Sequence, residues 1–535
     1  MTAADHLTQA ISDAYDETPY ISNAFAYTSP GNLRAVASLY GLATPALDNA
    51  RVLELGGAAG GNLLPFAMAY PGAQVVGIDL APQQIEAGQR IAEKVGARNL
   101  DLRAMSLTDI TPEFGMFDYI ICHGVFSWVP PEVRDAIFRI CRENLAPEGI
   151  AYISYNTYPG WKAADVVRDA MILNSFGAQT AQEKLASAKE MLDLIENGLW
   201  HNNPLHAALQ NVAGKLRGQS DHYVLHEYLE AINTPCYFLE FAAAAQQAGL
   251  AYVTDAEPHL TFASTYGAKV ALGLNGLSAN GNREMREQYL DFAVGRSFRK
   301  SLLVHADRAG QMLAQPEGSA FKAMHFSTKL DSAAAATPGA SAEHRHYLTP
   351  NGATLSSKDP AMVGMIDALN QAWPRALPFD AILDIAQQHN PGAAPEDLCN
   401  AVYMNLITLV QSSAVHFRME PSAYMAADSK PALIPGALPL LREVTRRPSQ
   451  VGMYNFWHQP VNPPADALSQ FIALQMDGTH SLTDLRTQVR EALTSGRLAH
   501  PNGQTYKGAR NLEPVAQEFL NALLAELRRA GLLLN

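Results

Sequence analysis

Cysteine is scarce in this sequence, and its spacing excludes two kinds of cross-linked protein. The 535 residues contain only four cysteines, Cys122, Cys141, Cys236 and Cys399, and no two of them form a C-x-x-C pair. A disulfide framework or a thiolate zinc site needs clustered cysteines. We therefore expect reduced thiols, no bound metal and a cytoplasmic location.

Positively charged residues are also few compared with negatively charged ones. Lys and Arg number 39 against 52 Asp and Glu, which gives a formal net charge of −13. A general nucleic-acid-binding protein is expected to be basic. The charge balance therefore argues against nucleic acid as a partner and favours a basic one.

Long hydrophobic runs are missing as well. No apolar run reaches the roughly 18 residues that a membrane-spanning helix needs, and the start Met-Thr-Ala-Ala-Asp-His lacks the basic and apolar regions of a signal peptide. We expect no signal peptide and no membrane span. Hydrophobic residues make up 48% of the chain and charged residues 17%, which is typical of a globular protein. The length predicts three or four domains.

The sequence does contain a pattern typical of a nucleotide-binding site. The segment Arg51-Val-Leu-Glu-Leu-Gly-Gly-Ala-Ala-Gly-Gly-Asn62 begins as a short apolar strand, turns at glycines and leads into a helical pattern. A second apolar run, 75–79, ends in Asp79, about 20 residues beyond the turn. Glycines let the backbone approach a ligand closely, and the carboxylate can accept hydrogen bonds from two ribose hydroxyls.

The spacing within the turn indicates which nucleotide binds. A dinucleotide site uses G-x-G-x-x-G to hold a pyrophosphate, whereas this turn reads Glu54-x-Gly56-x-Ala58-x-Gly60. The Glu54 carboxylate would repel a pyrophosphate but suits an ammonium group. S-adenosylmethionine (SAM) has an ammonium, a ribose and no phosphate, so the turn favours SAM. Ala58 replaces the middle glycine of the usual motif, and we expect its methyl group to be tolerated at a negative φ.

Strands and helices alternate on both sides of Asp79. Hydrophobic periodicity predicts strands at 52–55, 75–79, 100–105, 117–122 and 149–154, with helices between them at 62–69, 81–96 and 130–145. This alternation predicts an α/β domain with a Rossmann-like, mostly parallel sheet and helices on both faces. Ligands of such domains bind at the carboxyl ends of the strands. The aromatic segment 155–161, which follows the fifth strand, is expected to be a loop at that edge.

The rest of the chain is predicted to form further, mainly helical units. Composition changes near Asp221, at the low-complexity stretch 332–342 and at the prolines near 431 suggest their boundaries. The expected units are a SAM-binding domain with an N-terminal lid (1–215), a mainly helical middle domain (216–307), a linker (308–345), a helical domain (346–430) and a winged-helix-like C-terminal domain (431–535).

Two motifs in these later units have alternative interpretations. The segment 471–485 has a helix-turn-helix pattern with Ser481 as a helix cap, but Asp477 and Asp484 make it unsuited to DNA, so protein docking or dimerisation is favoured. His222 and His226 are four residues apart, yet no third ligand follows at a diagnostic spacing. We expect them to be ordinary core or surface histidines.

Several segments together resemble one protein family. They include Tyr15-Asp-Glu-Thr-Pro-Tyr20, the glycine turn at 53–62, His123-Gly-Val-Phe-Ser-Trp-Val-Pro130, the segment 154–161 and, in the middle domain, 226–229 and 286–292. The chain resembles the bacterial class I SAM-dependent methyltransferases that carry a methyltransferase regulatory domain, a group that contains the rickettsial protein-lysine methyltransferases of outer membrane proteins. The resemblance implies a methyltransferase with SAM as cofactor and S-adenosylhomocysteine as product. It also implies a lysine acceptor on a protein, such as an outer membrane or surface protein before export, and the chain could act as a homodimer.

Two sets of candidate site residues follow. Those expected to contact SAM are Tyr15, Tyr20, Glu54, Gly56, Gly57, Ala58, Gly60, Asn62, Asp79, Leu80, Ser106, Leu107, His123 and Gly124. A lysine acceptor must also lose its proton, and an aromatic channel would remove water from the ammonium and lower its pKa. The residues expected to line that channel are Trp128, Tyr155, Asn156 and Tyr158.

Two alternatives stay open at this stage. A small-molecule N- or O-methyltransferase would use the same SAM-binding domain, although the long C-terminal extension suits a protein substrate better. A catalytically silent SAM-binding scaffold is the second alternative, because Ala58 and Ser106 depart from the usual motif.

Overall fold

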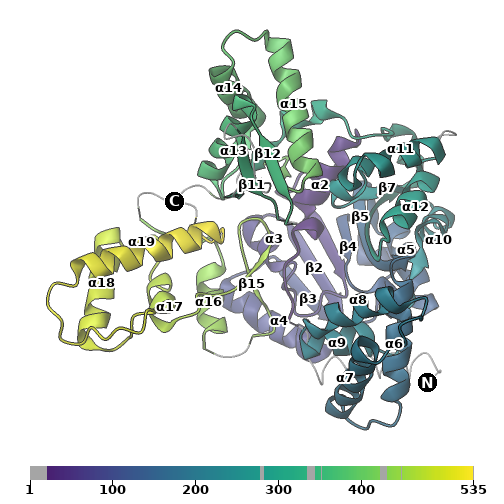
Figure 1. Ribbon diagram of the computed structural model, residues 1–535, viewed down its shortest axis with the longest axis horizontal. Helices are drawn as coiled ribbons and strands as arrows, with labels where there is room; N and C mark the ends of the chain where they lie inside the picture. Colours follow the sequence, from purple (N-terminus) through teal and green to yellow (C-terminus); the bar gives the residue numbers. More distant parts are fainter. Residues whose placement is uncertain are drawn as a thin grey trace.

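The computed structural model describes residues 21–277, 282–333, 344–350, 352–421, 424, 430–446 and 449–533. Figure 1 shows a central sheet with helices around it, a green unit above the sheet, and a yellow C-terminal arm that extends to the left. Within the described ranges, no helix combines the length and apolar content that a bilayer crossing requires.

A mostly parallel sheet forms the centre of the molecule. Its strands are β1 (Arg51–Leu55), β2 (Gln74–Asp79), β3 (Leu100–Ala104), β4 (Phe117–Cys122), β5 (Leu145–Tyr158), β6 (Cys236–Tyr237), β7 (Leu250–Asp255) and β8 (Phe298–His305). The strand order is β3-β2-β1-β4-β5-β8-β7, and β6 pairs with the end of β5. β1 to β5 pair in parallel, as the alternating sequence pattern predicts.

Helices cover both faces of this sheet. They are α2 (Pro30–Leu39), α3 (Leu64–Ala69), α4 (Pro82–Val95), α5 (Pro131–Glu143) and α10 (Phe238–Gln247). Val52 of β1 packs in the cluster that contains α2, α3 and α4, whereas its neighbour Leu53 packs with α5 and α10. β1 is apolar at successive positions because both of its faces are buried.

The predicted domain boundary near residue 215 does not coincide with the edge of this sheet. β7 and β8, which lie in the predicted middle domain, pair antiparallel with each other, and β8 also pairs antiparallel with β5. The helices α11 (Ala268–Leu277) and α12 (Arg283–Val294) lie between these two strands along the chain. The sheet body therefore extends to His305.

The predicted aromatic loop at 155–161 is also partly a strand. β5 continues to Tyr158 because its end pairs with β8, where Asn156 is opposite Phe298, and with β6.

After β5 come four helices that form a separate cluster at the lower right of Figure 1, namely α6 (Lys162–Asn174), α7 (Ala181–Asn197), α8 (His206–Arg217) and α9 (Asp221–Tyr228).

The predicted linker at 308–345 is largely folded where the structure describes it. Phe321, Met324 and Phe326 are buried, and β9 (His325–Ser327) pairs with two later strands. These apolar residues pack under the next helices, which the glycine and alanine content of the segment did not indicate. The unit contains β13 (Leu377–Pro378), β14 (His416–Arg418), the hairpin of β11 (Arg345–Leu348) and β12 (Thr354–Ser357), and the helices α13 (Pro360–Ala372), α14 (Phe379–His389) and α15 (Pro395–Gln411).

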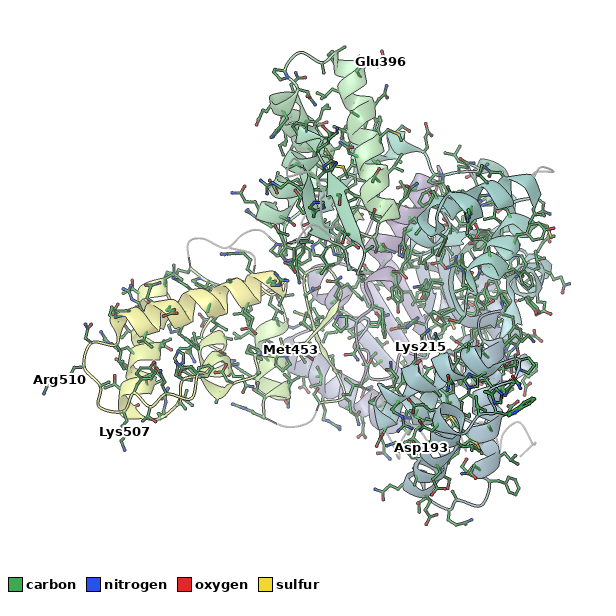
Figure 2. The ribbon with its side chains drawn as sticks, in the orientation of Figure 1. Asp193, Lys215, Glu396, Met453, Lys507 and Arg510 are labelled. Atoms are coloured by element: carbon green, nitrogen blue, oxygen red, sulfur yellow. The ribbon has the colours of Figure 1, made fainter. Side chains whose placement is uncertain are left out.

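The C-terminal arm contains α16 (Ala437–Val444), β15 (Met453–Tyr454), β16 (Pro460–Val461), α17 (Ala467–Ala473), α18 (Leu482–Ser495) and α19 (Glu513–Arg529). Ser481 caps α18 in a reciprocal pair with Asp484, as the sequence predicts. Figure 2 shows Lys507 and Arg510 at the outer tip of the arm and Met453 at its junction with the sheet body. At that junction α16 packs on α4, and the Lys94 Nζ is 2.5 Å from the Glu443 carboxylate.

Candidate functional site: a pocket at the carboxyl ends of β1 to β4

The glycine turn after β1 is held against the end of β2. The amides of Gly56 and Gly57 both donate to the Ile78 carbonyl at 2.9 Å. Gly56 has a φ of +74°, and a Cβ at this position would overlap the side chain of Val125. Only glycine satisfies both conditions.

Ala58 does not keep the negative φ that the sequence analysis expected. Its φ is +47°, so an alanine occupies the left-handed region here. Its amide donates to Asp79 Oδ2 at 2.8 Å, and this bond to an anionic acceptor offsets part of the cost of the conformation. The methyl group is accommodated, but by a different backbone conformation from the expected one.

Asp79 stands at the end of β2 and holds two segments of backbone. Its Oδ2 accepts from the Ala58 amide, and its Oδ1 accepts from the Ala81 amide at 2.9 Å. The carboxylate thus joins the glycine turn to the start of α4 and also lines the pocket.

Glu54 is the buried acid of the turn. Its residue exposure is 3%, and its Oε1 accepts from Asn62 Nδ2 at 2.7 Å. The Oε2 atom has no hydrogen-bond partner among the described residues. Burial raises the pKa of Glu54 to about 7, and the nearby Asp79 charge acts in the same direction while the Asn62 bond opposes it. A buried carboxylate oxygen without a partner is an acceptor for a ligand cation.

These residues surround a cavity of about 270 Å³. Most of the predicted SAM contacts line it, namely Glu54, Gly56, Gly57, Ala58, Asn62, Asp79, Leu80, Ser106, Leu107, His123 and Gly124. Gly60 does not line it, and a Cβ there would meet Leu102 at 2.9 Å. Tyr15 and Tyr20 lie outside the described residues.

Other lining residues lie outside the predicted set of SAM contacts. Ser22, Asn23 and Phe25 reach it from the segment before α2, Phe298 from β8, and His226 and Glu227 from α9. Burial raises the pKa of Glu227 to about 7. Phe25 belongs to the aromatic stretch that the sequence offers as part of an N-terminal lid. No local motif identifies the others, since each reaches the pocket only through the packing of its element. Within the described ranges, no group of three or more His, Cys, Asp or Glu side chains is placed to hold a metal ion.

An aromatic cluster closes one side of the cavity around His123. The ring centroids of Phe25 and Tyr27 lie 4.4 and 5.5 Å from that of His123, and Phe298 lies at 6.2 Å. The His123 Nδ1 is 3.0 Å from Ser154 Oγ and 3.1 Å from the Tyr152 hydroxyl. Burial, together with the charge of Lys300, lowers the pKa of His123 to about 3. The imidazole is therefore neutral at pH 7 and does not repel a cationic ligand.

Of the residues predicted to line an acceptor channel, the structure brings only Trp128 to the cavity. Tyr155 stacks on Phe241 inside the core at a ring distance of 4.0 Å, on the opposite side of β5 from Ser154. Asn156 is buried and donates to Asn233 Oδ1 at 3.1 Å. Tyr158 donates to Asp165 Oδ2 at 2.7 Å, with Lys162 over its ring. None of these three side chains lines the cavity, since each has its own partners elsewhere.

A second, larger cavity of about 700 Å³ adjoins the first. Phe25 lines both, so the two cavities meet at this residue. The larger cavity lies between the sheet body, the unit of α13 to α15, and the C-terminal arm. Its walls carry the carboxylates Glu257 and Glu420, the cations Lys329 and Arg418, and the aromatic residues Tyr27, Tyr70, Tyr424, Phe456 and Trp457.

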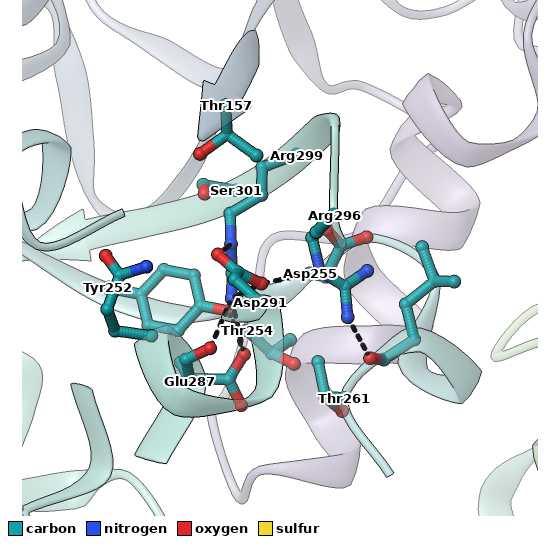
Figure 3. Close-up of polar contacts among 12 residues, drawn as sticks. Thr157, Tyr252, Thr254, Asp255, Thr261, Glu287, Asp291, Arg296, Arg299 and Ser301 are labelled. Carbon is teal, nitrogen blue, oxygen red and sulfur yellow. Dashed lines mark hydrogen bonds and ion pairs between the residues drawn. The ribbon is translucent and has the colours of Figure 1, made fainter. Parts of the chain in front are cut away.

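A buried ion network holds the strand that carries Phe298. Arg299 of β8 donates to both carboxylate oxygens of Asp291 in α12 at 2.8 Å, and to Glu287 Oε2 at 3.1 Å (Figure 3). Arg296 donates to Asp291 Oδ1 at 2.7 Å. Asp291 is fully buried and Arg299 is 1% exposed. The network fixes α12 to the strand whose Phe298 lines the smaller cavity.

Three protein-family models match the chain. The model described as a methyltransferase domain matches residues 53–151, the predicted methyltransferase regulatory domain matches 220–305, and the PKMT C-terminal winged helix domain matches 434–532. Two proteins of Rickettsia prowazekii are each 41% identical to this chain over the matched residues. The match to RP789 covers 57% of this chain and 54% of that protein, and the match to RP028 covers 44% of this chain and 94% of that protein. The chain thus spans about half the length of RP789.

Solved structures extend the similarity to nearly the whole chain. PKMT2 from Rickettsia typhi superimposes with a TM-score of 0.83 and 27% identity, over 96% of this chain and 100% of that chain. Its complex with AdoHcy gives a TM-score of 0.82 over 97% of this chain.

The fold and these matches define the chain as a SAM-dependent methyltransferase, which confirms the predicted fold class, enzyme class and cofactor. Within that class, it belongs to the family that combines a methyltransferase domain with a methyltransferase regulatory domain and a PKMT-type winged-helix domain.

Proposed function

We propose that this methyltransferase transfers the methyl group of SAM to lysine side chains of a polypeptide. The observation that carries the proposal is the junction of the two cavities at Phe25. The smaller cavity has the polar groups that SAM requires. The larger one has aromatic rings and two carboxylates on its walls, together with the cations Lys329 and Arg418, and we infer that its rings and carboxylates receive a long cationic side chain presented by a protein.

Four predicted residues would hold the cofactor in the smaller cavity. The Glu54 Oε2 atom would accept a hydrogen bond from the ammonium group, and Asp79 would accept from the ribose hydroxyls. Ser106 and Leu107 follow β3 and would face the adenine. A Cβ on Gly57 would lie 3.4 Å from Glu54 Oε2, so glycine keeps the approach to this carboxylate open.

The acceptor would reach the cofactor past the aromatic cluster of Phe25, Tyr27, His123 and Phe298. Lys300 already places its ammonium 4.4 Å from the Tyr27 ring centroid, so this ring accommodates a cation. Glu257, which lines the larger cavity and pairs with Lys300, would attract the incoming ammonium. Beside these rings the ammonium loses water, and its pKa falls.

Methyl transfer from SAM requires little covalent chemistry from the protein. SAM supplies an electrophilic methyl group on a sulfonium that leaves as AdoHcy. The chain has to exclude water, hold the neutral amine in line with the methyl group, and avoid positive charge beside the sulfonium. The neutral His123 adds no charge beside the sulfonium, the surrounding rings exclude water, and the Lys300 ammonium over the Tyr27 ring is paired with Glu257.

The resemblance to the rickettsial enzymes extends the proposal to the kind of protein and the compartment. An outer membrane or surface protein, modified in the cytoplasm before export, is the proposed substrate, and PKMT2 and the PKMT winged-helix match support a protein acceptor. The SAM and channel residues named above and a homodimeric state are part of the same proposal. Light scattering of the purified chain tests the homodimer.

The substrate class can be tested with matched acceptors. The full chain would be incubated with tritiated SAM and a lysine-rich polypeptide, the same polypeptide with its lysines acetylated, or free lysine. We expect transfer to the first acceptor alone, with mono-, di- or trimethyllysine identified by mass spectrometry. Methyl groups only on carboxylates, or only on a small molecule, would contradict a lysine-directed enzyme. SAM binding without transfer to any acceptor would favour a silent scaffold.

A further inference from the structure

The C-terminal arm reaches the cofactor pocket through His458. The His458 Nε2 lies 3.1 Å from Asn62 Oδ1, although the two residues are 396 positions apart in the sequence. Asn62 lines the smaller cavity and His458 lines the larger one. Their hydrogen bond therefore crosses the wall between the two cavities.

The hydrogen bonds of Asn62 determine which atom of His458 carries the proton. Asn62 Nδ2 donates to the Glu54 carboxylate at 2.7 Å, so its amide orientation is fixed. Its Oδ1 then accepts from the Phe25 amide at 3.0 Å, while the Thr28 hydroxyl, 2.9 Å from Oδ1, also has the Phe25 carbonyl as an acceptor at 2.8 Å. An oxygen in this position can take only a donor from the imidazole, so His458 is protonated at Nε2. Burial lowers the pKa of His458 to about 4, which leaves the ring neutral at pH 7.

The backbone of His458 supports a specific role for this side chain. Its φ is +57°, a conformation that residues other than glycine seldom adopt, and the residue is only 8% exposed. Such strain persists where the surrounding structure requires it. Here it accompanies the contact of the imidazole with Asn62.

A second contact between the arm and the pocket is independent of His458. The Ser22 amide donates to the Gln450 carbonyl at 2.8 Å, and the Gly452 amide donates to the Ser22 carbonyl at 2.9 Å. On its other side, Ser22 Oγ accepts from the Gly61 amide at 2.8 Å. A Cβ on Gly61 would overlap the Ser22 carbonyl, so the two segments are in close contact. Ser22 is therefore held between the glycine turn and the arm.

We propose that the segment 450–458 of the C-terminal arm is part of the cofactor site, with His458 as a positioning residue that orients Asn62 and, through it, the Glu54 carboxylate. The inference rests on the proposed binding of SAM in this pocket. It assigns to the PKMT-type winged-helix unit a role in SAM affinity in addition to any docking of a protein substrate. SAM binding should in turn stabilise the segment 450–458, because coupling between two sites is reciprocal.

Three variants of the full chain test this role. His458→Ala removes the donor, whereas His458→Gln places an amide nitrogen the same number of bonds from the backbone. Both carry the same backbone strain, so their difference isolates the hydrogen bond. Ile472→Ala is the matched control, because Ile472 is fully buried in the same arm and its side chain takes no part in the hydrogen bonds of Asn62. Calorimetric titration would measure the dissociation constant for SAM, and circular dichroism would verify folding.

We expect His458→Ala to weaken SAM binding about 2- to 10-fold, the range for one hydrogen bond. His458→Gln should restore it to about the wild-type value, and Ile472→Ala should leave it unchanged. Wild-type affinity in a folded His458→Ala chain would overturn the inference. So would an equal loss in all three variants, because that points to general destabilisation.

Hydrogen exchange of the wild-type chain gives a readout that does not depend on the variants. SAM or AdoHcy should slow exchange at the amides of 450–458, and exchange that is unchanged on binding would overturn the inference even if the His458→Ala chain fails to fold. A wild-type chain that does not bind SAM would instead defeat the proposed function.

Discussion

At the scale of single residues, Glu54 combines deep burial with a carboxylate oxygen that lacks a partner among the described residues. Burial favours the protonated form, which is why the pKa of Glu54 rises to about 7. An ammonium ligand favours the ionised form. The affinity of the pocket for SAM therefore changes with pH as the Glu54 carboxylate ionises.

We predict that SAM binding tightens about tenfold between pH 6 and pH 8, as Glu54 changes from mostly protonated to mostly ionised. Glu54→Gln should weaken binding about 10- to 100-fold at pH 8, the range for a charge-assisted bond, and should flatten the pH dependence. Glu227→Gln is the matched control, since burial also raises the pKa of Glu227 to about 7 in the same pocket. Titration calorimetry across this range is the measurement, and affinity that falls as the pH rises would count against the role of Glu54.

Substitutions at Phe25 and Tyr158 distinguish the acceptor channel that the structure indicates from the one expected from the sequence. Phe25→Ala should lower kcat/KM for a lysine-containing polypeptide by up to about tenfold, because the two cavities meet at this residue. Tyr158→Ala should change it by less than about twofold, because Tyr158 contacts Asp165 and Lys162 instead. Steady-state kinetics would decide. A larger loss for Tyr158→Ala would restore the expectation drawn from the sequence.

At the scale of elements, the glycine turn owes its shape to packing as much as to its ligand. From the sequence, Gly60 is expected to contact SAM as part of the glycine turn. In the structure, a Cβ on Gly60 would lie 2.9 Å from Leu102 of β3, on the side away from the cavity. A substitution here should therefore disturb the fold of the turn before it blocks the ligand.

We predict that Gly60→Ala lowers the free energy of unfolding by about 2 kcal/mol or more. Gly96→Ala is the control. Gly96 also has a left-handed φ, +80°, but a Cβ there would meet no atom within 4 Å. That variant should lose only the conformational term, about 1 kcal/mol. Urea unfolding measures both, and equal losses would show that the contact with Leu102 has no energetic effect.

The ion network of α12 and β8 is the second test at this scale (Figure 3). Asp291→Asn should lower the free energy of unfolding by about 3–5 kcal/mol, because Arg299 would remain charged and buried without its main partner. Asp101→Asn removes an exposed pair with Arg103 and should change it by less than about 1 kcal/mol. Denaturant unfolding monitored by fluorescence compares them, and a small effect of Asp291→Asn would show that water or other groups replace the carboxylate.

At the scale of the whole molecule, the units enclose the larger cavity together. His458 of the arm contacts Asn62 of the pocket, and Val451 of the arm pairs with Ser22 of the pocket. α16 of the arm packs on α4. From the sequence, deletion of residues 346–535 is expected to preserve SAM binding, with the C-terminal part acting only as a docking unit. The contacts in the structure predict a different result.

We predict that a chain truncated before residue 430 binds SAM at least about tenfold more weakly than the full chain, because Asn62 and Ser22 both lose partners. Calorimetry of the truncated chain, with its folding verified by near-ultraviolet circular dichroism, is the measurement. Full affinity in a folded truncated chain would show that the sheet body alone forms the cofactor site.

Local sequence determined the core of the methyltransferase fold. The strands of the parallel sheet, the turn that follows β1 and the acidic residue at the end of β2 lie within a few residues of their predicted positions. Glu54, Asn62 and Asp79 could be selected because each lies near the glycine turn or at the end of an adjacent parallel strand. Periodicity and short motifs encode such features, since the groups involved are close in the chain or related by a right-handed crossover.

Tertiary structure decided the rest of the site. Tyr155 and Asn156 lie in a strand, not a loop, because β8 pairs with the end of β5. Phe25 borders both cavities, and His458 reaches Asn62 from a different unit. These contacts join segments that are up to 396 positions apart. They depend on how whole units pack, and no local pattern of residue types records that packing.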